Sequence, residues 1–378
     1  MARKGKAGQK GRIAMGCAAL AVMFSAALMF GYNPFQDNLG TLTSPQPVVA
    51  RWDNVPSTPV SWFLNAPTPG KNVSNAGCND TLANCIQQAV EAGFNSWTGA
   101  QITIANTPQK LTDVAVTFGG TSSLTNPDYQ DCQNVIGFSD TNTSDFSTGT
   151  IAFTQITTVT RPSNVPSGTS FQYTCSGSAS KTCSLDDCIT DADIEFNPKV
   201  NFTTSVTPPS NTFNLQSVAT HEEGHFLGLD HSGIGHTVMF PFGDTALAGV
   251  QTQLQTDDAV GISFLYPTAS FSTATGVISG VVNSSNSGSI SAVFGAHVIA
   301  VNADTGNAVV DGITAPDGSY KLIGIPPGNY NILVLPMAPS SDAGILVLDN
   351  FSGWECGYAN SGCTTVPGNP TNFTGRYY

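Results

Sequence analysis

Three of the five histidines of this chain lie within eleven consecutive residues, inside the stretch THEEGHFLGLDHSG at positions 220–233. His221 and His225 are four residues apart, so on a helix both imidazoles project from one face on consecutive turns. That spacing suits two nitrogen ligands of one zinc ion, each about 2.0–2.1 Å from the metal. Glu222 lies roughly 100° around such a helix from His221, where it can reach a metal-bound water but is poorly placed as a ligand.

The residues after this predicted helix supply a third ligand. Gly228 tolerates backbone conformations that other residues resist, so the helix can end there and the chain can turn back. His231 then adds a third nitrogen to those of His221 and His225. Three neutral nitrogen ligands leave the fourth position of a zinc ion open, which is typical of catalytic sites, whereas structural zinc sites are closed. A chance match is the competing explanation, and the completeness of the pattern disfavours it.

Periodic patterns around the motif indicate the elements that position it. Apolar residues at helical spacing predict helices over 81–97 and 214–229, and a third helix begins at the cap candidate Thr256 and stops before Pro267. Alternating patterns predict strands at about Val60–Leu64 and within 113–120, 149–159 and 191–198. Residues 120–148 and 161–187 are polar, and we expect loops there.

The pattern changes after Pro267. A linker over 268–275 precedes strands that alternate with turn signals such as Pro316-Asp317-Gly318. We expect these strands near Val277–Val282, Ala296–Asn302, Tyr320–Ile325 and Tyr330–Pro336. They predict a small antiparallel sandwich over 276–378. The ending NFTGRYY resembles a strand cut short, so this module is either incomplete at its C-terminus or simply ends there.

The first residues have the features of an export segment. Five basic residues precede an apolar run from about 13 to 31, which predicts a signal peptide in 1–31. The run is also close to the length of a membrane span, so a cleaved signal and an uncleaved anchor are both open. Residues 32–50 form a polar lead-in to the domain that follows. We therefore expect a secreted or extracytoplasmic protein, bound to a membrane only if the segment is uncleaved.

Charge excludes one class of partner. The chain has 13 basic and 26 acidic residues, and without the five basic residues of the export segment the balance is 8 − 26 = −18. Such an acidic chain is not expected to bind nucleic acid. Calcium at Asp191 or Asp193 is a further candidate, because acidic loops of exported proteins can bind it.

The cysteines point to disulfides. Nine cysteines minus Cys17, which lies in the apolar run, leave eight, and an exported chain favours pairing them. Cys78 with Cys85 and Cys356 with Cys363 are close enough to pair locally. The other two bonds would join members of a second group, Cys132, Cys175, Cys183 and Cys188. A cysteine zinc cluster is less expected, because no C-x-x-C spacing repeats.

The histidine motif resembles that of the metzincin zinc peptidases. In this sequence the residues that match it are His221, Glu222, His225, Gly228 and His231. Ser232 follows the third histidine, and a serine at this position resembles the matrixin branch of that group. VMFP at 238–241 resembles the matrixin Met-turn, with Met239 as its methionine. Three further stretches resemble the opening strand, first helix and C-terminal helix of that family: RWDN…VSWFLN, CIQQAVEAGFNSWTG and TDDAVGISFLYP. The resemblance covers about residues 50–267.

The resemblance implies a fold and an activity. The fold is α+β: a zincin domain over 51–267, with a mixed twisted sheet and three helices, followed by the small all-β sandwich. The activity is that of an exported zinc endopeptidase acting on proteins or peptides, with a zinc-bound water activated by Glu222 and the substrate extended along the edge strand in 150–158. Met239 would pack beneath the histidines, and Phe240 and Pro241 would wall the substrate pocket. Asp257 and Asp258 would anchor the Met239 turn from the third helix; the alternative is that their charges only complement the dipole at the start of that helix.

The departures from the family matter as well. Residues 32–50 contain no cysteine, so latency through a thiolate on the zinc is not expected. The only other histidines are His236, expected in a loop, and His297, expected on a strand face, so a second, structural zinc is not expected. The segment around GAHVIAVNADTG resembles transthyretin-type, carboxypeptidase regulatory-like sandwiches and carries no catalytic constellation, so it could bind a surface ligand. The alternative to an active peptidase is a surface adhesion or binding protein with an inactive peptidase domain, which the complete ligand set disfavours.

Overall fold

The computed structural model describes most of the chain from residue 33 onward. The described residues are 33–41, 43–66, 72–124, 128–138, 146, 149–176, 180–242, 251–286, 289–337, 346, 348–352, 356–359, 373 and 375–377. The predicted export segment, 1–31, lies outside them. Within the described part of the chain, no helix has the length and apolar character needed to cross a membrane.

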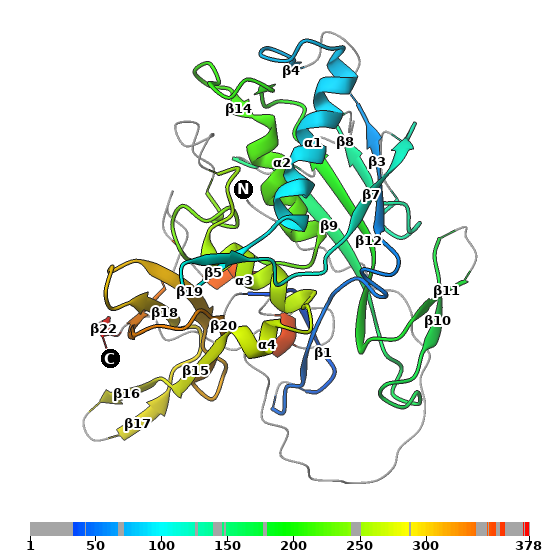
Figure 1. Ribbon diagram of the computed structural model, residues 1–378. Coiled ribbons are helices and arrows are strands. Elements are labelled where there is room, and N and C mark those ends of the chain that lie inside the picture. Colours follow the sequence, from blue (N-terminus) through cyan, green and yellow to red (C-terminus); the bar gives the residue numbers. More distant parts are fainter. Residues whose placement is uncertain are drawn as a thin grey trace.

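A mixed five-stranded sheet forms the scaffold of the first domain (Figure 1). Its strands are β3 (Val60–Asn65), β7 (Val116–Thr121), β8 (Val135–Gly137), β9 (Ala152–Thr160) and β12 (Asp187–Phe196). They lie in the order β7-β3-β8-β12-β9. The first four run parallel, and only β9 pairs antiparallel, with β12. β9 is therefore an edge strand, as predicted for 150–158.

Helix α1 (Leu82–Thr98) packs beside the sheet and confirms the helix predicted over 81–97 (Figure 1). The hydroxyl of Thr81 accepts a hydrogen bond from the amide of Asn84, which satisfies one of the free N–H groups of the first turn. The buried side of the helix follows the predicted spacing and consists of Cys85, Ile86, Ala89, Val90, Gly93, Phe94 and Trp97. The amphipathic pattern therefore determines both the extent of this helix and the face that it buries.

Helices α2 (Leu215–Phe226) and α3 (Thr256–Leu265) confirm the other two predicted helices. Asn214 caps α2 by accepting a hydrogen bond from the amide of Ser217 at 2.8 Å. The expected cap of α3 was wrong: Thr256 is the first helical residue, and the cap position belongs to Gln255. Both helices are buried almost all round, because α2 packs against α1, β9 and β12 and α3 packs against β19 and β20 of the C-terminal strands.

Short strand pairs complete this domain. They are β1 (Gln36–Asn38) with β2 (Pro47–Val49), β5 (Ile102–Ile104) with β6 (Thr107–Gln109), β10 (Phe171–Thr174) with β11 (Ser180–Cys183), and β4 (Val73–Ser74), β13 (Phe202–Thr203) and β14 (Phe213–Asn214) together. The hairpin of β10 and β11 falls in 161–187, where a loop was expected, and β8 falls in 120–148. These strands are only three or four residues long, which is too short for an alternating pattern to predict a strand.

The C-terminal residues form antiparallel sheets. β15 (Gly276–Val281) pairs with β20 (Ser319–Ile325), and β16 (Asn283–Asn286) pairs with β17 (Ser289–Ala292). A four-stranded sheet has the order β19-β18-β21-β22, with β18 (His297–Asn302), β19 (Ala308–Ile313), β21 (Tyr330–Leu335) and β22 (Arg376–Tyr377). The four predicted strands, which correspond to β15, β18, β20 and β21, are confirmed, and β16, β17, β19 and β22 are additional. Two short 3-10 helices follow, η2 (Leu348–Phe351) and η3 (Cys356–Tyr358).

The two sets of elements share one hydrophobic core. Leu322 and Ile325 of β20 belong to the same buried cluster as Val260 and Leu265 of α3. The predicted linker over 268–275 contains the short helix α4 (Phe271–Ala274), whose Phe271 is only 5% exposed. Burying an aromatic side chain of this kind contributes about 2 kcal/mol. The C-terminal module is therefore packed firmly against α3.

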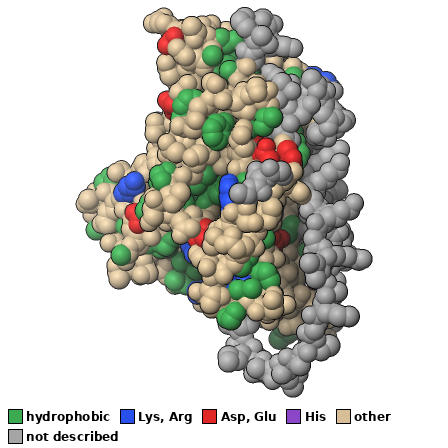
Figure 2. Space-filling view, turned by 90° about the vertical axis from the view of Figure 1, so that its right-hand side faces the viewer, with side chains coloured by type: hydrophobic (Ala, Val, Ile, Leu, Met, Phe, Trp, Pro, Cys, Tyr) green, Lys and Arg blue, Asp and Glu red, His purple; other side chains and the backbone are tan. Residues whose placement is uncertain are grey.

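Three disulfides lie within the described residues, joining Cys78 to Cys85, Cys132 to Cys175 and Cys183 to Cys188. These confirm the predicted local pair and the predicted second group of four. Cys356 is also disulfide-bonded, and its expected partner Cys363 lies outside the described residues. On the face seen in Figure 2, charged side chains are few and scattered among neutral polar surface, in keeping with 10% charged residues.

Candidate metal centre

The two helical histidines lie side by side on α2. His221 and His225 are 2% and 4% exposed, and their ring centroids are 4.8 Å apart. The i, i+4 spacing therefore places both rings on one buried face, as the sequence predicted.

The third histidine joins them because the chain turns sharply after the helix. α2 ends at Phe226, and Gly228 has a φ of +102°, a conformation that favours glycine. The ring of His231 then lies 4.7 Å from that of His225 and 5.3 Å from that of His221, measured between centroids. One ligand atom from each of the three residues lies within 4.8 Å of the others.

Hydrogen bonds fix which nitrogen each ring presents. Nδ1 of His221 lies 2.6 Å from the carbonyl oxygen of Val238, and Nδ1 of His225 lies 2.8 Å from that of Leu229. Nδ1 of His231 contacts the carbonyl of Asn350. A carbonyl only accepts, so each Nδ1 carries the proton and donates it, which leaves each Nε2 with a lone pair. This arrangement of outer partners is the one that orients histidine ligands of a metal.

The donor set fits zinc. Three neutral imidazole nitrogens converge, and the buried Nε2 of His221 has no hydrogen-bond partner within the described residues. Burial lowers the pKa of His221 to about 3, so its ring is neutral and able to bind a cation at physiological pH. The residues present are therefore those that a catalytic zinc ion requires.

Glu222 lies directly beside the triad and is 1% exposed. Its Oε2 accepts a hydrogen bond from the hydroxyl of Thr154 at 2.8 Å, and the same hydroxyl lies 3.0 Å from the backbone carbonyl of Glu222. Thr154 belongs to the edge strand β9. The sheet edge therefore contacts α2, the helix that carries His221 and His225, at the carboxylate of Glu222. The sequence carried no signal for Thr154 beyond its place in the predicted strand.

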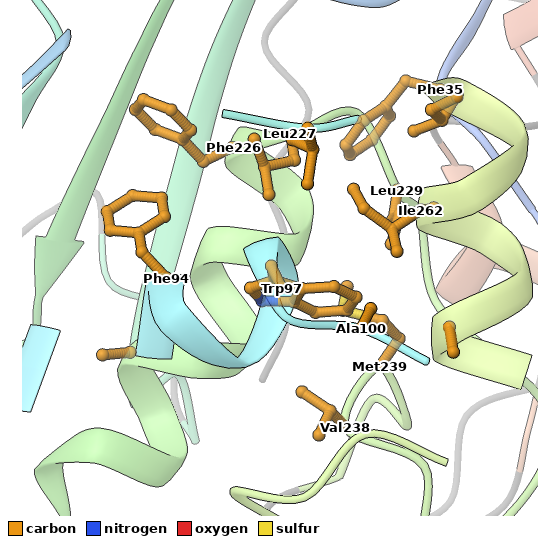
Figure 3. Packing of buried hydrophobic residues seen from close by; sticks show 14 of the residues in the cluster. Phe35, Phe94, Trp97, Ala100, Phe226, Leu227, Leu229, Val238, Met239 and Ile262 are labelled. Atoms are coloured by element: carbon orange, nitrogen blue, oxygen red, sulfur yellow. The ribbon is translucent and has the colours of Figure 1, made fainter. Parts of the chain in front are cut away.

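Met239 packs beneath the metal helix (Figure 3). It is 2% exposed, and a Cβ added to Gly224, the residue before His225, would lie 2.2 Å from its sulfur. The figure shows Met239 beside Trp97 of α1. The carboxylate of Asp258 accepts hydrogen bonds from the amides of Val238 and Met239 at 3.0 and 3.1 Å, which anchors this turn as expected. Burial raises the pKa of Asp258 to about 6.

The remaining predicted residues lie in the chain segments around the turn of Val238 and Met239. Phe240 is half-buried and contacts the ring of Phe242 at 5.6 Å between centroids, while Pro241 is buried. His236 is an exposed loop residue with a φ of +72°, as expected for its position. Asp230 accepts a hydrogen bond from the amide of His231 at 2.8 Å, so it serves the loop.

Asp191 and Asp193, the calcium candidates, lie on β12 and are buried. Among the described residues they do not form a group of three converging ligand atoms, whereas the histidine triad does. Calcium at these positions remains a prediction.

Sequence reasoning missed the residues that reach the site from far along the chain. Asn33 donates from its amide to the carbonyl of His231 at 2.9 Å, and the ring of Phe35 lies 5.7 Å from that of His225. His297, expected to be an ordinary strand-face residue, lies with Asp311 against Gly233. The sequence marks Asp311 as a polar residue inside the apolar run AVVDGI, but that pattern does not tell which residue it contacts.

An α+β domain with three converging imidazoles and a neighbouring glutamate defines a site of the zinc-metallopeptidase class. The chain belongs to the matrixin family, whose family model matches residues 72–267. The triad formed by His221, His225 and His231 is the catalytic zinc site typical of matrixins. The resemblance of the C-terminal module to transthyretin-type sandwiches stays a prediction.

Similar curated proteins support the family over shorter stretches. Metalloendoproteinase 5-MMP of Arabidopsis thaliana is 41% identical over 63 residues, 16% of this chain and 16% of that protein. Metalloendoproteinase 2-MMP of the same plant is 45% identical over 53 residues, 14% of each chain. Karilysin of Tannerella forsythia is 38% identical over 53 residues, 14% of this chain and 10% of that protein. The chain thus spans 16% or less of the length of these relatives.

Proposed function

We propose that this protein is an exported zinc-dependent endopeptidase. The observation that carries the proposal is the convergence of three oriented imidazoles next to a buried glutamate in a matrixin domain. A site with three protein ligands keeps a position for water or substrate, which a purely structural zinc site lacks.

The side chains have separate roles in this mechanism. His221, His225 and His231 would hold zinc through Nε2. When bound, zinc lowers the pKa of a water ligand and polarises the scissile carbonyl. Glu222 accepts the proton of the attacking water on its carboxylate and passes it to the leaving amine. The hydroxyl of Thr154, 2.8 Å from Oε2, keeps the carboxylate oriented toward that exchange.

The edge strand offers a place for the substrate backbone. β9 pairs with β12 on one side only in the five-stranded sheet, so an extended peptide can add to its other side. Thr154 on this strand contacts Glu222, which brings such a peptide close to the proposed base. Phe240 and Pro241, in the turn that Asp258 anchors, would line the pocket for one substrate side chain. The partner is therefore an extended segment of a protein or peptide.

Export is supported by the three disulfides, which persist in oxidising compartments. The N-terminal segment then acts either as a cleaved signal or as a membrane anchor. The intact mass of the protein recovered outside the cytoplasm distinguishes these, because cleavage removes roughly the first 31 residues.

The deciding experiment is Glu222→Gln in the full chain. The amide keeps the size of the side chain but cannot act as a base, so hydrolysis of a generic protein substrate should fall by about 10³-fold or more, while zinc stays at one ion per chain. Glu91→Gln on α1, whose carboxylate accepts a hydrogen bond from the side chain of Gln87, is the matched control and should retain wild-type activity. Full activity of Glu222→Gln would refute the assignment. Zinc binding without cleavage by the wild-type chain would favour the alternative, a surface binding protein with an inactive peptidase domain.

A further inference from the structure

The third histidine differs from the other two in where its outer hydrogen bond comes from. His221 and His225 donate to carbonyls at Val238 and Leu229, inside the matrixin domain. His231 instead donates to the carbonyl of Asn350, which lies 119 positions further along the chain, in η2 of the C-terminal module.

A second contact holds the residue two positions after this ligand. Oδ2 of Asp311 accepts a hydrogen bond from the amide of Gly233 at 2.7 Å and lies 2.6 Å from Nε2 of His297. Asp311 and His297 are 0% and 4% exposed and lie on the neighbouring strands β19 and β18. A buried carboxylate that meets both an imidazole and a backbone N–H is a strong and directional contact.

A third contact joins the C-terminal module to helix α3, which anchors the Met-turn. The amide of Asp311 donates to Oδ1 of Asp257 on α3 at 3.0 Å, and Asp257 is also hydrogen-bonded to the side chain of Ser232. Three consecutive residues of the ligand loop, His231, Ser232 and Gly233, are thus tied directly or through Asp257 to the C-terminal module.

Any side chain at Gly233 would have to displace the buried His297–Asp311 pair. A Cβ added there would lie 2.5 Å from Nε2 of His297 and 2.7 Å from Oδ2 of Asp311. Gly235, in the same loop, would place a Cβ with no atom within 4 Å. The close approach is therefore a local property of the contact between Gly233 and the His297–Asp311 pair.

We propose that the C-terminal module is part of the zinc site, and that His297 and Asp311 are positioning residues for the third ligand, His231. The helical ligands are held by α2, whereas a ligand on a loop must be ordered by its contacts, at a cost in backbone entropy. Outer-shell partners of this kind typically change metal affinity by about 10- to 100-fold. The inference rests on the proposed zinc site but not on peptidase activity.

The test compares zinc affinities of full-length variants, measured by competition with a chromophoric chelator. Gly233→Ala and Asp311→Ala should each raise the zinc dissociation constant about tenfold or more. Gly235→Ala should leave it unchanged. His297→Leu should weaken zinc binding, and His297→Gln, which keeps an N–H near the position of Nε2, should restore most of it.

Two further readouts separate positioning from ordinary stability. The absorption spectrum of the cobalt-substituted protein should change in Gly233→Ala, because the third ligand is displaced, and not in Gly235→Ala. Thermal unfolding of the metal-free variants shows whether they fold. Folded variants with wild-type zinc affinity and cobalt spectrum would overturn the inference while the peptidase assignment stands. A wild-type chain that binds no zinc would instead overturn the proposed function itself.

Discussion

Two rows of buried polar side chains lie on opposite faces of the same edge of the central sheet. On one face, Glu222 of α2, next to the histidine triad, meets Thr154 of β9. On the other face, the register of β12 against β9 places Asp191, Asp193 and Glu195 at alternate positions, opposite Thr157, Gln155 and Phe153. Both rows are almost completely buried, so burial alone does not distinguish them.

The difference lies in how the polar atoms are used. The three imidazoles each donate from Nδ1 to a carbonyl, so their Nε2 atoms converge. Each acid instead uses one oxygen to hold a separate backbone amide: Asp191 accepts from that of Cys132 at 2.9 Å, and Asp193 from that of Val135 at 2.7 Å. Oδ1 of Asp191 and Oδ2 of Asp193 have no hydrogen-bond partner among the described residues. Converging lone pairs create a place for an ion, whereas acids that each bind a separate amide fasten a loop to the sheet.

The largest expected effect comes from Gly228→Ala, which breaks the convergence. Gly228 has a φ of +102°, and a Cβ there would lie 2.8 Å from the carbonyl oxygen of Ala50. We expect the free energy of unfolding to fall by about 2–4 kcal/mol and the zinc affinity to drop strongly, because the turn carries His231 away from the helical ligands. Urea unfolding and chelator competition measure the two effects.

Gly168→Ala is the matched control for that substitution. Gly168 also has a positive φ, +79°, but an added Cβ would meet nothing within 4 Å. The Gly168→Ala substitution should lower the free energy of unfolding by about 1 kcal/mol and leave the zinc affinity unchanged. Equal losses of zinc affinity in both variants would contradict the argument that the turn at Gly228 positions the third ligand.

The contrast between the helical and loop ligands also explains what the sequence could predict. The relative positions of His221 and His225 follow from their i, i+4 spacing on a helix, and Gly228 indicates the turn that follows. The triad could therefore be predicted from eleven residues. Asn350 and Asp311 reach the site through tertiary packing across more than 75 residues, and no local pattern encodes such a contact. The same holds for the fold: α1 and β9 have periods that run over many residues, whereas the strands of the β10–β11 hairpin are four residues long, too short for a period to identify them.

A smaller effect is expected from Thr154→Val, which removes the hydroxyl that meets Glu222. Valine has nearly the same shape, so the sheet should be unaffected, and zinc affinity should stay at the wild-type value. We expect kcat to fall about tenfold, equivalent to roughly 1.4 kcal/mol, because the carboxylate loses the hydrogen bond at 2.8 Å that orients it. Steady-state kinetics on a peptide substrate measure this change.

Thr190→Val on β12 serves as the control for Thr154→Val. The hydroxyl of Thr190 is also in a buried residue and donates at 3.1 Å, but to the carbonyl of Thr157, with no contact to Glu222. Its kcat should match that of the wild type. If both variants lost activity to the same extent, the effect would belong to the packing of the sheet edge and not to the proposed base.

The smallest expected effect tests the acidic row through pH. Burial raises the pKa of Asp191 to about 7, well above the value of about 3.9 in an unfolded chain. The folded state therefore holds a proton that the unfolded state has released, so this contribution to stability is complete below about pH 4 and is lost as the pH rises through 7. Between pH 6 and 8, the free energy of unfolding of the wild type should fall by about 1 kcal/mol more than that of Asp191→Asn. A rise in stability with calcium that Asp191→Asn abolishes would contradict this account, because it would make the row a converging ion site like the histidines.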